Sequence, residues 1–379
     1  MAKSQKIRGK ALRVTRDNAA AILAEAVRLQ HAGDLRGAGS RYEAVLATFP
    51  DQPDALNGLA MLDHAAGRHA RAASRLLDLS ARYPSHPGLY MNLGAVQTAA
   101  GDLTAAAASF RQAIELNPRY PDPYYNLGDL YLRQGDPERA IAVFDACMAA
   151  VGRQFHALAY KAHALIDAGR QDEADYLMDH DRYVHAWTFP VPSGYADIGS
   201  FNAALAGHVA SHPSLRKNIF ATEHGKHTAE LATPPLGPFK PMLERIDDAV
   251  RWYLAQLPDD ANHPMVRWRP CRWKLTSWGV VMFNRGHERP HIHPNGWLSG
   301  VFYVQLPELI DDPARRPEGW LEFGRPTPDL HFASPPMLRH YQPCYGQMFL
   351  FPSYLYHGTV PFQSDQRRIC VAFDIEPLY

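Results

Sequence analysis

The chain has 379 residues, which is enough for two or three domains by the usual size of a folded domain. It carries 39 Lys and Arg residues and 39 Asp and Glu residues, so its formal net charge is zero when the histidines are neutral. This balance gives no reason to expect a nucleic acid or an anionic membrane as a partner.

The chain begins with a basic segment, residues 1–18, whose positive side chains are Lys3, Lys6, Arg8, Lys10, Arg13 and Arg16. Glu25 and Arg28 interrupt the apolar run that follows, so the segment does not read as a secretory signal. No stretch approaches the length of a membrane span. We interpret residues 1–18 as a solvated, flexible leader. The cysteines have no metal-ligand spacing and indicate reduced thiols in a cytoplasmic protein; they are Cys147, Cys271, Cys344 and Cys370.

Residues 19–186 contain a repeat of 34 residues, in which a glycine is followed five positions later by an alanine. The glycines are Gly33, Gly67, Gly101, Gly135 and Gly169, and the alanines are Ala38, Ala72, Ala106, Ala140 and Ala174. The first three units also end in a proline, at Pro50, Pro84 and Pro118. This pattern is typical of tetratricopeptide repeats, each a pair of antiparallel helices. We predict an α-solenoid of about five repeats, in which a degenerate fifth repeat caps the stack.

A solenoid of this kind has a concave face that commonly holds an extended peptide or a partner protein. We therefore expect a protein or peptide partner in the groove of the repeats. The alternative is a structural spacer or a dimerisation arm, and the sequence does not fix the oligomeric state.

The helical pattern fades at the junction between the two halves, where Pro190 and Pro192 appear. We place the boundary near residue 186 and assign residues 187–379 to a second domain. Its first part is expected to contain two bracing helices, Phe201–His212 and Pro241–Leu257. Between them, the histidines of Glu223–His227 are interpreted as part of a polar loop.

From Trp268 onward the sequence alternates between short apolar strands and turns rich in Pro and Gly. The predicted strands are Trp273–Phe283, Leu298–Leu306, Trp320–Phe323, Gln347–Phe351 and Ile369–Ile375. Many short strands of this kind favour a jelly-roll, also called a double-stranded β-helix. The whole chain is thus a multidomain α + β protein, with a solenoid followed by a jelly-roll and its bracing helices.

Three histidines stand out in this second domain. His291 and His293 are one residue apart, and on an extended chain their imidazoles project to the same face. His357 follows the predicted strand that ends at Pro352, and Arg367 and Arg368 precede the last strand. Imidazole is a common ligand of iron and other transition metals, so a metal site is predicted.

This order resembles the iron(II)- and 2-oxoglutarate-dependent oxygenases, and most closely a bacterial subgroup. The matching motifs are His-x-His-Pro-Asn at 291–295, Leu-Ser-Gly-Val-x-Tyr-Val at 298–304 and Phe-Pro-Ser-x-Leu-x-His at 351–357. The resemblance implies Fe(II), 2-oxoglutarate as co-substrate and O2. It also implies that His291 and His357 are metal ligands, and that Arg368, or else its neighbour Arg367, binds the far carboxylate of 2-oxoglutarate.

One position departs from the usual pattern, because most of these oxygenases carry Asp or Glu where this chain has His293. His293 is then a third neutral ligand, or it only lines the pocket, or a carboxylate comes from Glu288 or Glu322. We favour three histidine ligands. Ser299 and Tyr303 share one face of the following strand and are candidates to contact 2-oxoglutarate.

Three functional classes follow. The first is a dioxygenase that hydroxylates a protein or peptide side chain recruited by the repeats, and this is the function we expect. The second is a small-molecule oxygenase or a cupin-like metalloenzyme in which the repeats serve assembly. The glutamate usual in cupins is absent, because Trp297 and Leu298 occupy its positions. The third is a binding scaffold without catalysis.

Overall fold

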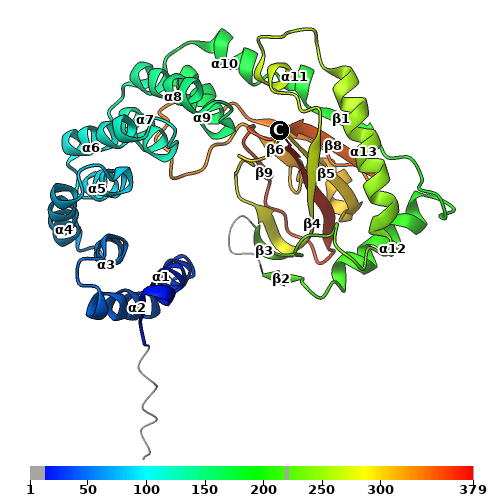
Figure 1. Cartoon of the computed structure of the whole chain (residues 1–379). Helices are drawn as coiled ribbons and strands as arrows, with labels where there is room; N and C mark the ends of the chain where they lie inside the picture. The colour runs from blue at the N-terminus through cyan, green and yellow to red at the C-terminus, as the bar shows by residue number, and fades with distance from the viewer. Residues whose placement is uncertain (1–12, 218–221, 379) are drawn as a thin grey trace, which may run out of the picture. The chain divides into compact units, whose positions relative to one another are not determined.

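The computed structural model describes residues 13–217 and 222–378 (Figure 1). The basic residues Lys3, Lys6, Arg8 and Lys10 lie outside the described residues, and the first helix begins at Arg16. The chain forms two compact units that divide between Leu130 and Tyr131. No helix within the described ranges combines the length and the apolarity needed to cross a membrane.

The N-terminal half is a succession of antiparallel helix pairs. These helices are α1 Arg16–His31, α2 Leu35–Thr48, α3 Pro53–Ala65, α4 His69–Arg82, α5 Pro87–Ala99, α6 Leu103–Leu116, α7 Asp122–Arg133, α8 Pro137–Val151, α9 Phe155–Asp167 and α10 Gln171–Leu177. All five repeat glycines have positive φ angles, from +72° to +85°, which glycine adopts readily. All five repeat alanines are fully buried. The repeat prediction is therefore confirmed at the positions on which it rested.

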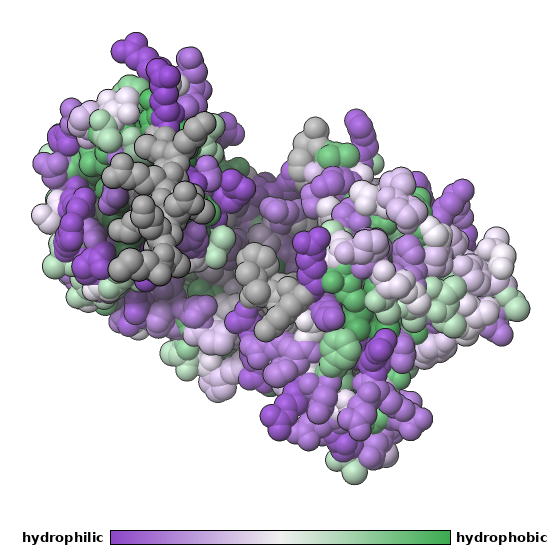
Figure 2. Space-filling model, turned by 90° about the horizontal axis from the view of Figure 1, so that it is seen from below, coloured by the Kyte–Doolittle hydropathy of each residue, from purple (hydrophilic) through white to green (hydrophobic). Residues whose placement is uncertain are grey.

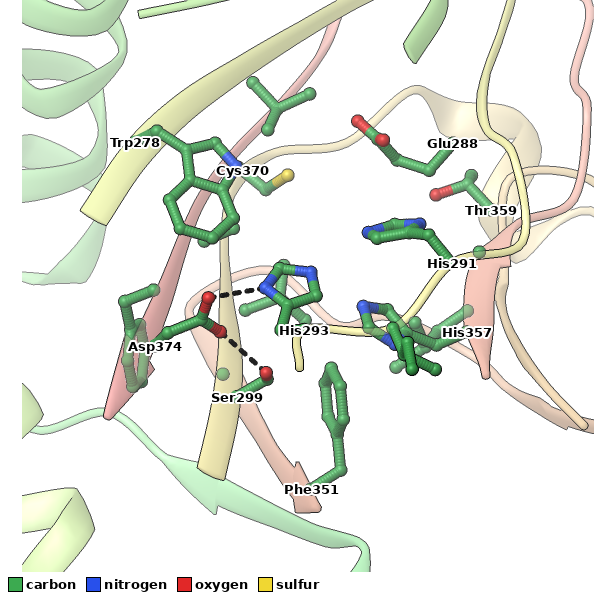
Figure 3. A pocket seen from close by; sticks show the side chains of 18 of the residues that line it. Trp278, Glu288, His291, His293, Ser299, Phe351, His357, Thr359, Cys370 and Asp374 are labelled. Atoms are coloured by element: carbon green, nitrogen blue, oxygen red, sulfur yellow. Dashed lines mark hydrogen bonds and ion pairs between the residues drawn. The ribbon is translucent and has the colours of Figure 1, made fainter. Parts of the chain in front are cut away.

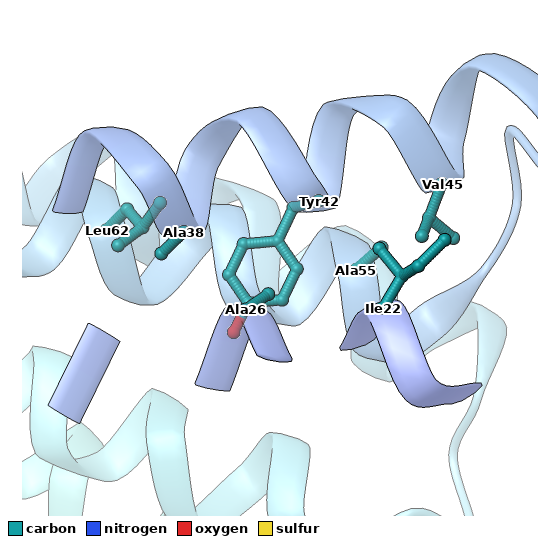
Figure 4. Close-up of a cluster of buried hydrophobic side chains, with 7 residues drawn as sticks. All are labelled: Ile22, Ala26, Ala38, Tyr42, Val45, Ala55 and Leu62. Atoms are coloured by element: carbon teal, nitrogen blue, oxygen red, sulfur yellow. The ribbon is translucent and has the colours of Figure 1, made fainter. Parts of the chain in front are cut away.

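The core of the first repeats is built around the Tyr42 ring (Figure 4). The buried side chains of this cluster are Ile22, Ala26, Ala38, Tyr42, Val45, Ala55 and Leu62. The Tyr42 hydroxyl lies 3.1 Å from Oε1 of Gln30. A Cβ atom on Gly58 would lie 2.3 Å from the Tyr42 ring, so the glycine leaves the space that the ring fills.

The C-terminal half contains two antiparallel sheets. The larger has the order β1-β8-β5-β10-β4-β3-β2 and the smaller has the order β7-β6-β9. Their strands are β1 His185–Thr188, β2 Arg216–Lys217, β3 Thr222–His227, β4 Trp273–Glu288, β5 Leu298–Gln305, β6 Leu321–Phe323, β7 Arg339–Tyr341, β8 Gln347–Pro352, β9 His357–Thr359 and β10 Arg368–Pro377. Phe323 of the smaller sheet packs edge-on against Phe351 of the larger, with ring centroids 4.9 Å apart. The sheets thus form the expected jelly-roll-like domain.

Helices α12 Ile198–Ala210 and α13 Phe239–Gln256 brace the larger sheet (Figure 1). Tyr253 of α13 packs against Trp297, with ring centroids 5.9 Å apart. The short helices α11 His180–Tyr183 and α14 Pro264–Arg267 complete the domain, together with the 3-10 helices η1 Glu308–Asp311 and η2 Pro313–Arg315. All five predicted strands and both predicted helices are present with shifted ends. The loop prediction for Glu223–His227 is wrong, because that segment pairs with β4 as strand β3.

Apolar side chains are largely covered in both units. Figure 2 shows one face, on which hydrophilic residues predominate and hydrophobic residues form small groups. Among the described residues, the large hydrophobic side chains left exposed are scattered along the chain; they are Val27, Leu77, Tyr176, Val191, Phe283, Met337, Tyr345 and Leu378.

Within the second unit, the last repeat packs against the turn of residues 353–356, which precedes His357. The Phe155 ring stacks on Tyr354 with centroids 6.2 Å apart, and the Tyr354 hydroxyl donates a 2.5 Å hydrogen bond to the Leu177 carbonyl. His163 contacts Tyr356 at 5.3 Å between ring centroids. The first strand, β1, begins at His185, close to the expected boundary. That residue 186 separates two domains stays a prediction.

We expect Gly58→Ala to destabilise the protein by about 1–3 kcal/mol, because its methyl group overlaps the Tyr42 ring. This is the net destabilisation, because the cost of the clash should exceed the gain of about 1 kcal/mol that alanine brings to a helix interior. The matched control is Gly39→Ala in α2, where the new Cβ would lie 3.5 Å from Leu62, an ordinary contact. Urea unfolding followed by circular dichroism measures both variants. Equal effects of the two changes would show that Tyr42 packing does not require Gly58.

We also expect a pH-dependent stability that involves His163. Burial lowers the pKa of this side chain from 6.5 to about 4 in the folded protein. The unfolded chain therefore binds more protons between these pH values, and stability falls as the pH drops from 6.5 to 4, by about 3 kcal/mol for this group. The loss should be smaller by that amount in His163→Leu, measured by urea unfolding across the pH range. His31→Leu, which alters an exposed side chain, should retain the wild-type dependence.

Candidate metal centre

A backbone bridge joins the two segments that carry the histidines. His291 and His357 pair as an isolated antiparallel bridge, and each donates its N–H to the carbonyl of the other at 3.0 Å. The His293 N–H donates to the Ser353 carbonyl at 2.9 Å. His293 lies outside any strand, so the rings converge through these bonds and not through the alternation of a regular strand.

The three imidazoles meet at one point of the cavity (Figure 3). One ring nitrogen of each lies within 4.8 Å of the other two. Nδ1 of His291 lies 2.7 Å from the Arg289 carbonyl, and Nδ1 of His357 lies 2.9 Å from the Leu355 carbonyl. A carbonyl only accepts hydrogen bonds, so Nδ1 carries the proton in both rings. Their Nε2 atoms therefore keep a free lone pair.

The third ring, His293, is oriented by a carboxylate. Its Nδ1 lies 2.5 Å from Oδ2 of Asp374 on β10. The Ser299 hydroxyl donates to the other Asp374 oxygen at 2.7 Å and lies 2.9 Å from the Ser353 hydroxyl. Nε2 of His293 is buried and has no hydrogen-bond partner among the described residues. A carboxylate behind an imidazole is the usual outer partner of a metal-binding histidine.

The protonation of two of the three rings also suits a cation site. Burial, together with the nearby His293, lowers the pKa of His291 to about 4. Burial likewise holds the pKa of His357 well below its ordinary value. Burial lowers the pKa of His293 too, but the charge and the hydrogen bond of Asp374 more than offset it, and the net shift is upward. His291 and His357 are therefore neutral at neutral pH, while Asp374 favours a proton on His293.

The histidines line a cavity of about 370 Å³ between the two sheets, and Arg368 lines the same cavity. Arg368 is 2% exposed, and the centre of its guanidinium lies 5.1 Å from the Tyr303 ring. It makes no ion pair within the described part of the chain. Its Nε and the buried Tyr303 hydroxyl both lack a hydrogen-bond partner there. In the same part of the chain, the guanidinium Nη1 donates only to the sulfur atoms of Met282 and Cys370, both at 3.7 Å, and sulfur is a weak acceptor, so these buried donors are suited to an anion.

The structure distinguishes the two arginines that the sequence left open. Arg367 is exposed and does not line the cavity, whereas Arg368, Cys370, Ala372 and Asp374 lie on the cavity face of β10. Ser299 and Tyr303 also line it, although the Ser299 hydroxyl is already engaged with Asp374.

Neither candidate carboxylate belongs to the histidine cluster. Glu322 lies outside the cavity and pairs with Arg325 and His340, at 2.6 and 3.0 Å. Glu288 does line the cavity, where its Oε1 lies 2.6 Å from the Thr222 hydroxyl and 3.0 Å from Nε2 of His227. Burial raises the pKa of Glu288, but the hydrogen bond and charge of His227 and the Thr222 hydroxyl outweigh it, and the net shift is downward.

Sequence reasoning missed two features of this site. Asp374 is the polar residue of a predicted strand and lies six positions after Arg368. Residues an even number of positions apart on a strand face the same side, so the sequence could have placed Asp374 with Arg368. The sequence predicts a loop at His227, because Glu223–His227 has little of the apolar alternation that marks a strand. The pairing of β3 with β4 brings His227 to the cavity.

The donor set fits a transition metal. Three imidazoles whose Nε2 lone pairs converge, one of them buried without a partner, are suitable ligands for iron, zinc or copper. The neighbouring anion site is suited to a small carboxylate.

Comparisons with known families agree with both halves of the chain. Residues 276–374 match a family described as "Putative 2OG-Fe(II) oxygenase". Residues 29–93 and 121–150 match families described as "Tetratricopeptide repeat", and residues 94–135 match "TPR repeat". A search of curated proteins found no match.

Solved structures resemble parts of the chain. A MamA structure is 22% identical over 44% of this chain and 94% of its own, with a TM-score of 0.36. A TPR protein of Thermus thermophilus is 26% identical over 43% of this chain and 90% of its own, with a TM-score of 0.37. A Pseudomonas putida prolyl-4-hydroxylase is 12% identical over 54% of this chain and 99% of its own, with a TM-score of 0.37.

The chain therefore combines tetratricopeptide repeats over residues 29–150 with a domain of the 2OG-Fe(II) oxygenase family over residues 276–374.

Proposed function

We propose that the chain is a 2-oxoglutarate- and Fe(II)-dependent dioxygenase that hydroxylates a protein or peptide side chain recruited by the repeats. The observation that carries the proposal is one cavity that holds both a cluster of three histidines and a buried guanidinium without an anionic partner. The first suits a metal, and the second suits a dicarboxylate that reaches it.

His291, His293 and His357 would hold the iron through Nε2, which leaves other coordination positions for the co-substrate and O2. Fe(II), when bound, supplies the redox chemistry that turns 2-oxoglutarate, O2 and a substrate C–H group into succinate, CO2 and an alcohol. Asp374 holds the Nδ1 proton of His293 and fixes the orientation of that ring. Its negative charge also supplies, from behind His293, part of the negative charge that the usual carboxylate ligand would bring to the metal.

Arg368 is the proposed partner of the far carboxylate of 2-oxoglutarate. A guanidinium can donate two parallel hydrogen bonds to a carboxylate, and the Tyr303 hydroxyl is a further donor beside it. Burial raises the pKa of Tyr303, which keeps the hydroxyl protonated and able to donate.

The remaining walls of the cavity are largely apolar; they include Trp278, Val280, Val301, Leu321 and Phe351. Such walls exclude water and restrict the substrate to poses in which the reacting C–H group faces the metal. The repeats are proposed to supply the substrate, because stacked helix pairs form an extended binding surface. We also propose a cytoplasmic location.

A cupin-like enzyme or a non-catalytic scaffold would not require Arg368 to remain buried without a carboxylate. We expect Arg368→Ala to weaken 2-oxoglutarate binding at least about 30-fold, because a buried charged hydrogen-bonding partner is removed. The readout is the visible charge-transfer band that forms when Fe(II) and 2-oxoglutarate are added without oxygen. Arg367→Ala, at the exposed neighbour, should retain the band at wild-type affinity. A band that survives in Arg368→Ala would contradict the assignment of this residue.

We expect Asp374→Asn to lower the affinity for Fe(II) by about 10- to 100-fold, since the partner that orients His293 is lost. Competition with a chromophoric chelator measures the affinity without turnover. Asp365→Asn, at an exposed position before β10, serves as the control. Unchanged affinity in Asp374→Asn would mean that His293 is not a metal ligand.

A further inference from the structure

One carboxylate in the cavity has no role in the proposed metal and co-substrate sites. Glu288, at the end of β4, has a side chain that is only 13% exposed. Figure 3 shows its carboxylate in the cavity beside His291, on the side away from Asp374. Its two described hydrogen-bond partners, Thr222 and His227, both meet Oε1. The other oxygen, Oε2, has no hydrogen bond within the described residues.

Histidines aside, acidic side chains outnumber basic ones in the lining of the cavity. The acidic lining residues are Glu288, Asp374 and Glu376, and the only basic one apart from histidines is Arg368. Glu376 lies 3.6 Å from Lys274, and Asp374 is bonded to His293. If the proposed function holds, Arg368 is neutralised by the co-substrate. Glu288 has His227 as its ion-pair partner, but that contact is made at Oε1 alone, so Oε2 keeps its capacity to accept a hydrogen bond from a further cation.

The lining of the cavity suits a long side chain with a charged end. Apolar lining residues such as Leu321 and Phe351 lie near the histidine cluster, and Phe351 is 4.7 Å from the His357 ring centroid. Methylene groups can pack against such walls while a terminal cation reaches a carboxylate. Lysine and arginine side chains have this form.

We propose that Glu288 binds the cationic end of the substrate, which is a lysine or arginine side chain of a peptide. This inference rests on the proposed function and names its substrate class. Oε2 accepts hydrogen bonds from the ammonium or guanidinium group, while Thr222 and His227 hold the carboxylate in place through Oε1. The methylene groups of the side chain then pass the histidine cluster, where one of them is oxidised.

The test compares peptides that differ in charge. Full-length protein, loaded with Fe(II) and 2-oxoglutarate without oxygen, is titrated with N-acetylated, C-amidated Gly-X-Gly peptides in which X is lysine, arginine or norleucine. Norleucine keeps the methylene stem and lacks the charge. Binding is measured by calorimetry and by the change in the charge-transfer band. The tighter basic peptide should bind at least about tenfold more tightly than the norleucine peptide, as expected for a charged hydrogen bond.

Glu288→Gln should reduce this ratio to about one, while the affinity for Fe(II) and the band with 2-oxoglutarate persist. Glu322→Gln is the matched control, because it removes a carboxylate of the same domain that lies outside the cavity. It should retain the wild-type ratio. If Glu288→Gln does not fold, equal binding of the charged and neutral peptides by the wild-type protein would still overturn the proposal.

The outcomes separate the two proposals. No iron uptake and no band in the wild-type protein would overturn the proposed function itself. A normal band with equal or undetectable binding of all three peptides would overturn only the role of Glu288. A more than tenfold loss of Fe(II) affinity in Glu288→Gln would also overturn it, because the carboxylate would then be a metal ligand.

Discussion

The candidate site depends on two backbone hydrogen bonds between His291 and His357, each 3.0 Å long. They join the turn before β5 to the start of β9, and so bring together ligands that are distant in sequence. A side-chain ligand set remains fixed only if its backbone is fixed, and neither histidine lies inside a long strand. The bridge therefore fixes the direction of the two histidine side chains, as the alternation of side chains does along a regular strand.

Around this bridge, two carboxylates have different surroundings. Asp374 lies behind an imidazole and acts on the cavity through His293, whereas Glu288 faces the cavity directly. Figure 3 shows the two carboxylates on opposite sides of the histidine cluster. In the proposed function, an anionic co-substrate would pair with Arg368 and a cationic substrate with Glu288, so the two would use different partners in one cavity.

The sequence predicts much of this architecture, because period and spacing are local properties. The 34-residue period gives the turn glycines and buried alanines directly, and alternation gives strands such as Leu298–Gln305. Contacts between distant segments leave no such signal. Nothing in Glu223–His227 indicates that it pairs with β4. Arg367 and Arg368 are adjacent in sequence, and only the structure shows that β10 buries the side chain of Arg368.

The contact of the last repeat with the turn before His357 has a practical consequence. Leu177, Phe155 and His163 all precede residue 187, yet they cover Tyr354 and Tyr356. A fragment that begins at residue 187 would expose the rings of Tyr354 and Tyr356. It would also leave the Tyr354 hydroxyl without its hydrogen-bond acceptor, the Leu177 carbonyl. Expression fragments that begin near Tyr131, where the compact unit starts, keep that cover intact.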